Sequence, residues 1–441
     1  MGCGSSVPEN ASTSSATSSD AAAPTGKNRH ASRQESLRGR SATLTRNSSI
    51  RVDSYTDKAQ EEDNYAAGLE TATFKAKYKV VSKTPLGKGA FAHVYHVQDK
   101  VDNSDWACKI VDKNHISIED GELRAIRWEA EAQMLCHEPG VVELRESFEC
   151  DDGGDMDKGF MFMVMEIMRG GELFDRIMQK SFYSEADAEE VVRGLATALQ
   201  NCHLHQVVHL DLKPENVLYM NKEGMYGGDV VKICDFGISR TLDPEHPAGG
   251  ELADGKCAPD GRLHGTPGYI SPEMILQQPF DEKCDVWQLG VLTYILLSGI
   301  PPFEEPPELE GTSAGMDAMF EFIKDGDYFP FDQYQPFAGE ENPWTVCSEE
   351  AKDFIIKTLT PDPNQRPDMK EVLLHPWIAN AETRVAVNRK RNLNGTQQRI
   401  AKLAARRRFK RGIRKLIVMQ KISGGFGDLV KAAAVRKGTE A

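Results

Sequence analysis

The chain has 441 residues, of which 40% are hydrophobic and 27% are charged, enough for a two-lobed domain with tails. Its longest largely apolar run, 289–297, is too short to span a bilayer, and no secretory signal opens the sequence. Nine cysteines, without a CxxC pair, favour a reducing intracellular compartment and argue against a zinc site.

The net charge of −14 is unevenly distributed. Residues 381–441 hold 17 lysines and arginines against 3 acidic residues, so the central part of the chain is strongly acidic. An acidic core between basic tails favours basic peptides as ligands, including the chain's own tail, and not nucleic acid.

Residues 1–77 are predicted to form a disordered tail, because the first 51 residues are rich in Ser, Thr and Ala and show no hydrophobic period. The opening six residues fit the N-myristoylation pattern at Gly2, and the adjacent Cys3 would accept a palmitoyl chain. Two acyl chains hold a protein stably at a membrane, so we expect it on the cytoplasmic face with a cytosolic pool. The alternative is a Gly/Ser tail without lipid.

A glycine-containing loop follows a strand pattern that begins at Tyr78. Gly87 and Gly89 would let backbone N–H groups approach phosphates closely, although Ala92 stands where such loops usually carry a third glycine. The candidate nucleotide-binding residues of this loop are Leu86, Gly87, Lys88, Gly89, Ala90, Phe91, Ala92, His93 and Val94.

The apolar strand predicted at 106–110 carries a single lysine, Lys109. A lysine facing a cleft needs anionic partners, which phosphate oxygens and a helix glutamate would supply. The helix expected at 123–136 offers Glu129 and Glu131. Glu131 is preferred, because Ala132, Met134 and Leu135 would then lie on the packed face, but Glu129 remains open.

The loop 209–217 places Asp211, Lys213 and Asn216 at fixed offsets on a turn stiffened by proline. It combines a base, a cation and a metal ligand, the groups that phosphoryl transfer requires. A strand predicted at 230–234 ends in Asp235, whose carboxylate would hold the metal together with Asn216. Oxygen ligands of this kind suit Mg²⁺.

These motifs together resemble the eukaryotic protein kinases over residues 78–378, and within them the calcium/calmodulin-dependent group. The resemblance implies an α+β, bilobal fold with a small β-rich nucleotide lobe and a large helical lobe. It also implies ATP and Mg²⁺ as cofactors and Ser/Thr as acceptor. Further matching motifs are Gly170–Ile177, Gly265–Tyr269, Ser271–Glu273, Asp285–Trp287, Asn364–Pro367 and His375–Ile378.

The resemblance also assigns roles to individual residues. Asp211 would orient and deprotonate the substrate hydroxyl, and Lys213 would neutralise the transferred phosphoryl group. Glu172 and Glu215 would bind a basic residue upstream of the acceptor, and Arg366 would pair with Glu273. The adenine and its phosphates would contact Ala107, Lys109, Glu131, Met165, Glu166, Met168 and Leu218.

Two departures from the family pattern concern control. Leu210 stands where the family usually has an arginine that gathers an activation-loop phosphate. Residues 261–264 carry no hydroxyl. We therefore expect control to come from elsewhere in the chain.

The C-terminal part, 379–441, is predicted to be a basic autoinhibitory tail with a helix at 397–422. Phe409, Ile413 and Val418 are spaced 1-5-10, as in helices that calmodulin engulfs. The alternatives are a membrane-surface helix and a solvated basic tail.

The sequence thus predicts a Ser/Thr kinase that its own tail inhibits and calcium-loaded calmodulin releases, acting on proteins with basic motifs. It is expected to be a monomer. One competing hypothesis is a nucleotide-binding pseudokinase scaffold. Another is a constitutively active membrane-bound kinase whose basic tail binds lipid.

Overall fold

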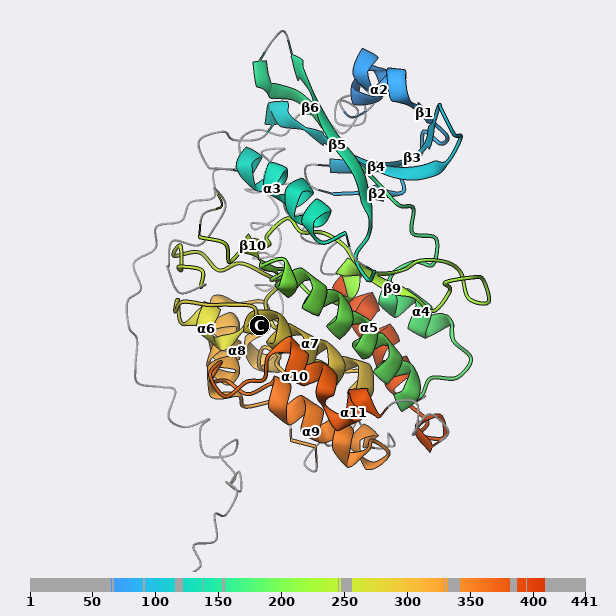
Figure 1. Ribbon diagram of the computed structural model, residues 1–441. Coiled ribbons are helices and arrows are strands. Elements are labelled where there is room, and N and C mark those ends of the chain that lie inside the picture. The colour runs from blue at the N-terminus through green and yellow to red at the C-terminus, as the bar shows by residue number, and fades with distance from the viewer. Residues whose placement is uncertain are drawn as a thin grey trace, which may run out of the picture. The chain divides into compact units, whose positions relative to one another are not determined.

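The protein is described by a computed structural model, which covers residues 65, 67–89, 92–115, 122–137, 139–152, 155–244, 246, 256–328, 330–331, 342–380, 387–393 and 395–408. They form a small lobe built on a sheet and a larger, mainly helical lobe (Figure 1). The predicted bilobal fold is confirmed. Within these residues, none of the helices combines the length and the apolar character needed to cross a membrane.

An antiparallel sheet of six strands forms the small lobe. Its strand order is β1-β3-β4-β6-β5, with β2 paired to β3. The strands are β1 (Tyr78–Val80), β2 (Gly87–Lys88), β3 (Ala92–Asp99), β4 (Asp105–Asp112), β5 (Leu144–Asp152) and β6 (Asp155–Met165).

Alternation along the strands gives this sheet two apolar faces. On the inner face, Val111, Met161 and Met163 pack with Leu123 and Ala130 of helix α3 (Glu122–Leu135), which follows the 3-10 turn η2 (Lys113–His115). The outer-face cluster includes Cys108, Ile110, Phe162 and Val164. A sheet that is apolar on both sides needs a second cover.

Tyr65 and residues 67–77 provide this outer cover, so the prediction that residues 1–77 are all disordered is wrong for this part. Residues 67–70 and α2 (Ala72–Lys77) are helical, and Leu69 and Phe74 are buried in the outer-face cluster. Gly68 allows the close approach, because a side chain there would lie 3.0–3.1 Å from Phe160 and Ile110. The folded domain therefore starts before Tyr78.

Replacing Phe74 by alanine should lower the free energy of unfolding by about 3–5 kcal/mol, the usual cost of emptying a buried phenylalanine site. Chemical denaturation would measure this loss. The matched control is Thr73→Ala on the exposed side of the same helix, which should stay within about 0.5 kcal/mol of the wild type. Equal stability of the two variants would show that the segment does not hold the lobe.

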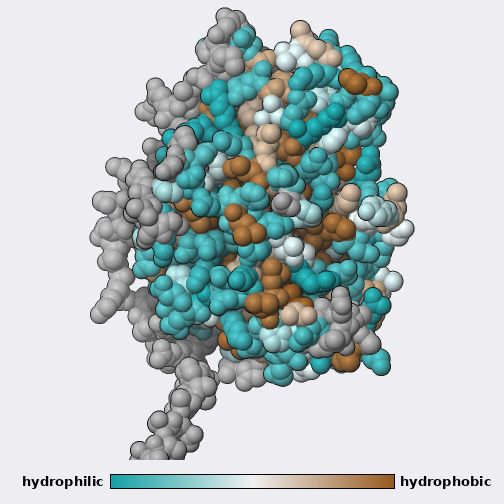
Figure 2. Space-filling model, in the orientation of Figure 1, coloured by the Kyte–Doolittle hydropathy of each residue, from teal (hydrophilic) through white to brown (hydrophobic). Residues whose placement is uncertain are grey.

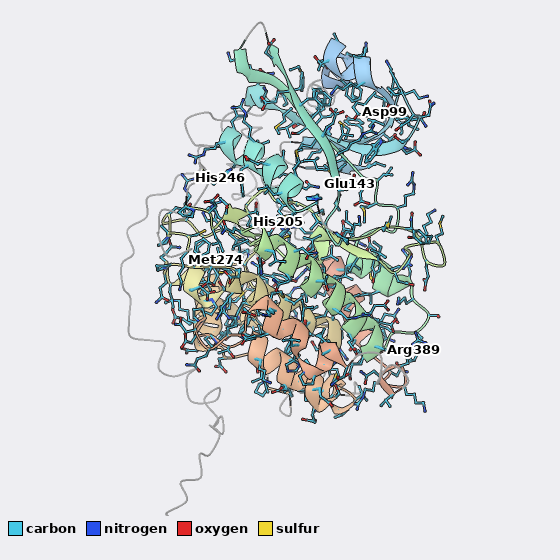
Figure 3. The ribbon with its side chains drawn as sticks, viewed as in Figure 1. Asp99, Glu143, His205, His246, Met274 and Arg389 are labelled. Atoms are coloured by element: carbon cyan, nitrogen blue, oxygen red, sulfur yellow. The ribbon has the colours of Figure 1, made fainter. Side chains whose placement is uncertain are left out.

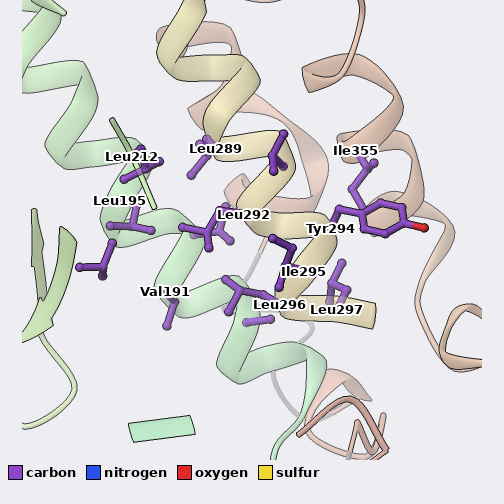
Figure 4. Close-up of a cluster of buried hydrophobic side chains, with 14 of the residues drawn as sticks. Val191, Leu195, Leu212, Leu289, Leu292, Tyr294, Ile295, Leu296, Leu297 and Ile355 are labelled. Atoms are coloured by element: carbon purple, nitrogen blue, oxygen red, sulfur yellow. The ribbon is translucent and has the colours of Figure 1, made fainter. Parts of the chain in front are cut away.

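The large lobe surrounds α7 (Lys283–Ser298), in which every residue from Cys284 to Ser298 is buried. Leucine and isoleucine side chains of α7 meet α5 on one side and α9 on the other (Figure 4). A helix that is apolar all round must lie inside a core. The other helices are α4 (Leu173–Gln179), α5 (Glu185–Leu204), α6 (Pro272–Ile275), α8 (Ser313–Asp325), α9 (Glu349–Thr358), α10 (Met369–Leu374) and α11 (Pro376–Ala379).

Short strands and turns of the large lobe flank the loops that carry Asp211 and Asp235. They are β7 (Val207–Val208), η3 (Pro214–Asn216), β8 (Val217–Tyr219), β9 (Val231–Ile233) and β10 (Arg240–Thr241). Strand β7 pairs with β10, and β8 pairs with β9. The 3-10 turns η4 (Pro307–Leu309) and η5 (Pro343–Thr345) lie farther along the chain. Hydrophilic residues cover most of the face seen in Figure 2, with separate apolar patches between them.

Candidate active site

The loop 209–217 is held by a carboxylate from the core helix α7. Asp285 is fully buried and accepts hydrogen bonds from the backbone N–H of His209 (2.9 Å) and of Leu210 (2.8 Å). Burial alone would raise the pKa of Asp285, but His203, 2.9 Å away, and these donors lower it overall. A charged carboxylate thus fixes the backbone directly before Asp211.

Asp211 lies at the centre of a compact polar cluster. Its Oδ1 accepts from Thr266 Oγ1 at 2.8 Å, and its Oδ2 accepts from Asn216 Nδ2 at 3.1 Å. Lys213 Nζ contacts Asp211 Oδ2 and lies 3.1 Å from Thr266 Oγ1. The structure therefore brings together the three loop residues that the sequence predicted and links them to Thr266. A carboxylate oriented in this way can accept the proton of a bound hydroxyl.

Lys109 pairs with Glu129, and the preference for Glu131 is wrong. The distance from Lys109 Nζ to Glu129 Oε1 is 2.5 Å, whereas Glu131 Oε1 lies 3.0 Å from His246 Nε2 (His246 is labelled in Figure 3). Burial alone would lower the pKa of Lys109, but Glu129 and Asp235 raise it overall, so the ammonium is charged.

The error came from the orientation of helix α3. Met134 and Leu135 were expected to pack, but both are exposed, whereas Glu129 and Gln133, one turn apart, are buried. Residues two positions apart do not share a helix face. Glu129 and Glu131 therefore could not both point toward Lys109.

Glu129→Gln should lower kcat/KM for peptide phosphorylation at least tenfold, about 1.4 kcal/mol, because Lys109 loses its charged partner. Glu131→Gln removes the same charge two residues away and should leave kcat/KM within about twofold, a difference below 0.5 kcal/mol. Steady-state kinetics of the two purified variants would decide. Equal losses would contradict the assignment of Glu129.

Asp235 and Asn216 are the oxygen donors that could hold a divalent cation. The Nδ2 of Asn216 is used by the Asp211 carbonyl (2.9 Å), so its Oδ1 is the atom available for a metal. Asp235 has a left-handed backbone (φ 70°), and the next residue, Phe236, is fully buried against His209 at 4.9 Å between ring centroids. This buried ring fixes Asp235 near Lys109, and the donor set fits a hard cation.

The nucleotide loop forms a hairpin. Leu86 N–H donates to Val94 O and Gly89 N–H donates to Ala92 O, each at 2.7 Å, while Ala90 and Phe91 lie outside the described residues. The ring of His93 lies against that of Tyr65, with centroids 4.0 Å apart and planes tilted by 33°, which places it against the N-terminal segment. His93 thus contacts Tyr65, whereas the sequence predicted a contact with nucleotide, and that contact stays a prediction.

The remaining predicted adenine contacts lie on neighbouring elements. Ala107 pairs with Met165 across β4 and β6, and Leu218 forms a bridge with Glu172. Glu166 N–H donates to Glu143 O at 3.0 Å, which leaves the Glu166 carbonyl as the group available to a ligand. The Glu166 carboxylate is bound by Lys232, so this side chain is not available to the ligand. Met168 follows on the same connection between the lobes.

Leu210, which stands where the family usually has an arginine, packs against the segment that follows Asp235. Leu210 is fully buried, and it belongs to an apolar cluster with Cys257, Ile270, Met274 and Phe280. The predicted pair of Arg366 and Glu273 is confirmed, with two bonds of 2.8 and 3.0 Å between buried groups. Burial alone would raise the pKa of Glu273, but Arg366 lowers it overall.

The C-terminal segment, defined here as residues 387–393 and 395–408, packs on the large lobe. Its first part is held by buried polar groups: Asn388 Nδ2 donates to Glu189 Oε2 at 2.9 Å, and Arg399 Nε donates to Ser298 O at 2.6 Å. Gly299 has a positive φ of 81° and allows this contact, because a Cβ there would lie 2.6 Å from Arg399 Cβ. The folded lobe thus extends past residue 378.

The end of this segment places three consecutive arginines on acidic groups. Arg407 Nη2 donates to Tyr269 Oη at 2.7 Å, and its Nη1 lies 3.5 Å from Glu215 Oε2. Arg408 contacts Asp175, and Arg406 pairs with Glu304 (3.1 Å) and Glu310 (2.5 Å). Burial raises the pKa of Tyr269 to about 12, so its hydroxyl is neutral and can accept a hydrogen bond.

Glu215 therefore receives a basic residue, as the sequence predicted for a substrate, but the residue comes from the chain itself. Glu172 precedes α4 as its N-cap, one turn before Asp175. The sequence prediction missed Asp175, Tyr269, Glu304 and Glu310, which only the folded chain gathers around the arginines. Gly2, Cys3, Phe409, Ile413 and Val418 lie outside the described residues, so the lipidation and calmodulin predictions stay predictions.

This site, with an ion-paired lysine, an aspartate in the loop 209–217 and two metal-ligand candidates, is that of a phosphotransferase. The protein kinase domain model matches residues 80–378, and the chain belongs to the protein kinase family. The family uses ATP and a divalent metal, which agrees with the donors found here.

Individual relatives come from the calcium/calmodulin-dependent protein kinases. The chain is 32% identical to the type II alpha chain of Drosophila melanogaster over 349 residues, 79% of this chain and 57% of that protein. It is 34% identical to the type 1 kinase of Caenorhabditis briggsae, covering 70% of this chain and 74% of that one. The chain thus spans little more than half the length of the type II relative.

Among solved structures, a twitchin kinase fragment of C. elegans, described as an autoregulated protein kinase with immunoglobulin domains, matches with a TM-score of 0.59 and 28% identity. The match covers 76% of this chain and 64% of that one. The relatives place the chain with the Ser/Thr kinases of the calcium/calmodulin-dependent group.

Proposed function

We propose that this protein transfers the γ-phosphoryl group of ATP to Ser or Thr of protein substrates with basic residues near the acceptor. The observation that carries this proposal is the intact set of Asp211, Lys213, Asn216 and Asp235 together with the Lys109–Glu129 pair. A pseudokinase scaffold would have no need of all these groups in working geometry.

Each of these residues has a separate role in phosphoryl transfer. Asp211 accepts the proton of the substrate hydroxyl, and Lys213, beside it, neutralises charge on the group being transferred. Lys109 binds the other phosphates while Glu129 keeps it in place. Mg²⁺, when bound by Asn216 and Asp235, supplies further neutralisation of the phosphate charge.

We further propose that the C-terminal segment inhibits the enzyme by occupying the substrate site. Arg407 lies on Glu215, an acidic residue of the loop 209–217, and thus takes the place of a substrate's basic residue. Calcium-loaded calmodulin would release it by binding the residues that follow, including Phe409, Ile413 and Val418. The names of the type II and type 1 relatives support this partner.

Release would be confined to the end of the segment. Asn388 and Arg399 are buried, and pulling them out would leave the buried Glu189 carboxylate and the Ser298 carbonyl without these donors, at about 1–3 kcal/mol each. The pairs of Arg406 and Arg408 are more exposed and contribute about 0–1 kcal/mol each. The segment would therefore open from its C-terminal end and stop near Leu403, which is buried in the core of the large lobe.

Acylation at Gly2 and Cys3 would hold this kinase at the cytoplasmic face of a membrane, with a cytosolic pool when only one chain is attached. The pattern of residues 1–6 supports this proposal. We propose that the enzyme works as a monomer. A constitutively active kinase whose tail binds lipid is the second candidate, favoured by the basic composition of residues 381–441.

Peptide phosphorylation by the full chain with Mg²⁺-ATP should rise at least tenfold on adding calcium/calmodulin, a change of about 1.4 kcal/mol. Asp211→Asn should abolish activity in both conditions, because no base remains. High activity that ignores calmodulin would favour the lipid-binding alternative. Nucleotide binding without any turnover would favour the scaffold.

Truncation after Ala405 should give a stable enzyme that is fully active without calmodulin, because the arginines are removed while the buried contacts of Asn388, Arg399 and Leu403 remain. Truncation after Trp377 removes those contacts too and should lower the melting temperature by several degrees. Activity and thermal unfolding of both proteins would be measured together. A shortened protein ending at Ala405 that still responds to calmodulin would contradict autoinhibition by these arginines.

A further inference from the structure

A second acidic site lies beside the one that holds Arg407. Arg406 reaches two carboxylates, with Nη1 3.1 Å from Glu304 Oε1 and Nη2 2.5 Å from Glu310 Oε1. Neither carboxylate belongs to the catalytic loop or to α4, the elements that carry Glu215 and Asp175. Arg406 therefore binds an acidic site, formed by Glu304 and Glu310, that the sequence motifs did not indicate.

The loop between α7 and α8 is shaped to present these two carboxylates. Residues 304–312 turn through η4, which brings Glu310 back beside Glu304 around one guanidinium. Glu305 accepts from Gly311 N–H and closes the loop. Gly315 lets α8 pack on it, because a side chain there would lie 2.3 Å from Leu309 O. The two carboxylates are therefore held in place by backbone contacts.

This loop borders a hollow of about 370 Å³ that reaches the catalytic residues. Lys213 and Thr266 line one end, Phe303 and Met319 form part of an apolar wall, and Glu304 and Glu310 stand at the rim. The hollow also borders Glu215, so one peptide in this groove can touch both acidic positions. Arg406 and Arg407 of the C-terminal segment now line it.

We propose that Glu304 and Glu310 form a second specificity site, which selects an additional basic residue in the protein substrate. This inference rests on the proposed kinase function and refines its substrate class to proteins with at least two basic residues near the acceptor. Two carboxylates around one guanidinium give charge-assisted hydrogen bonds in more than one direction. The substrate's second basic residue takes the place that Arg406 occupies in the inhibited chain.

The test uses the full chain carrying Arg406→Ala, Arg407→Ala and Arg408→Ala, so that both acidic sites are open. A peptide with one arginine is compared with a series in which a second arginine is moved through each position on either side of the acceptor. We expect kcat/KM to rise about tenfold for at least one position of the second arginine, mainly through a lower KM.

Adding Glu304→Gln and Glu310→Gln to this protein should abolish that preference, so that the ratio of the two kcat/KM values falls to near one. The matched control is Glu308→Gln, in the same loop and exposed, which does not line the hollow and should keep the ratio. Glu304→Lys with Glu310→Lys should invert the preference toward an acidic residue at the same peptide position.

An unchanged ratio in the Gln variant would overturn the inference and assign Glu304 and Glu310 to holding the tail only. A tenfold loss on both peptides alike would also overturn it, because the two residues would then support the fold or catalysis and not selection. Failure of the kinase proposal itself would look different, since the starting protein would phosphorylate neither peptide.

Discussion

The catalytic geometry depends on one buried charge, the carboxylate of Asp285 in the core helix α7. It fixes the backbone of His209 and Leu210 through two hydrogen bonds and is itself kept ionised by His203. Because α7 is buried from Cys284 to Ser298, the backbone directly before Asp211, the proposed base, is anchored to the core of the large lobe. Positioning of this kind, and not covalent chemistry, is what phosphoryl transfer requires of a protein.

The acidic surface beside Asp211, where we propose that substrates bind, is built from several elements around this one fixed loop. Glu215 comes from η3, Tyr269 from the segment before α6, and Asp175 from α4. The C-terminal segment contacts all three with consecutive arginines. Under the proposed autoinhibition, this acidic surface would bind the tail and the substrate with the same groups, so that the two would compete.

The sequence predicted the features that short motifs encode, namely the catalytic loop, Lys109, Asp235 and the Arg366–Glu273 pair. It failed where the answer depended on helix orientation, because the apolar Met134 and Leu135 suggested a packed face that is exposed. It also missed the packing of residues 67–77, 387–393 and 395–400. Short segments held by Phe74, or by polar bonds from Asn388 and Arg399, show no long hydrophobic period in the sequence. Glu304 and Glu310 could not be singled out among so many acidic residues before the fold brought them to one arginine.

The hydrogen bonds of Asn388, Thr396 and Arg399 to the large lobe have a consequence for proteolysis. Thr396 Oγ1 donates to Leu297 O at 2.8 Å, so together the three residues join the C-terminal segment to α5 and α7 without any help from the covalent link to α11. A protease that cut the chain between Asn380 and Val387 would leave two fragments still bound to each other, with the arginines in place. Under the proposed autoinhibition, the nicked protein would run as two fragments on a denaturing gel and yet remain inactive.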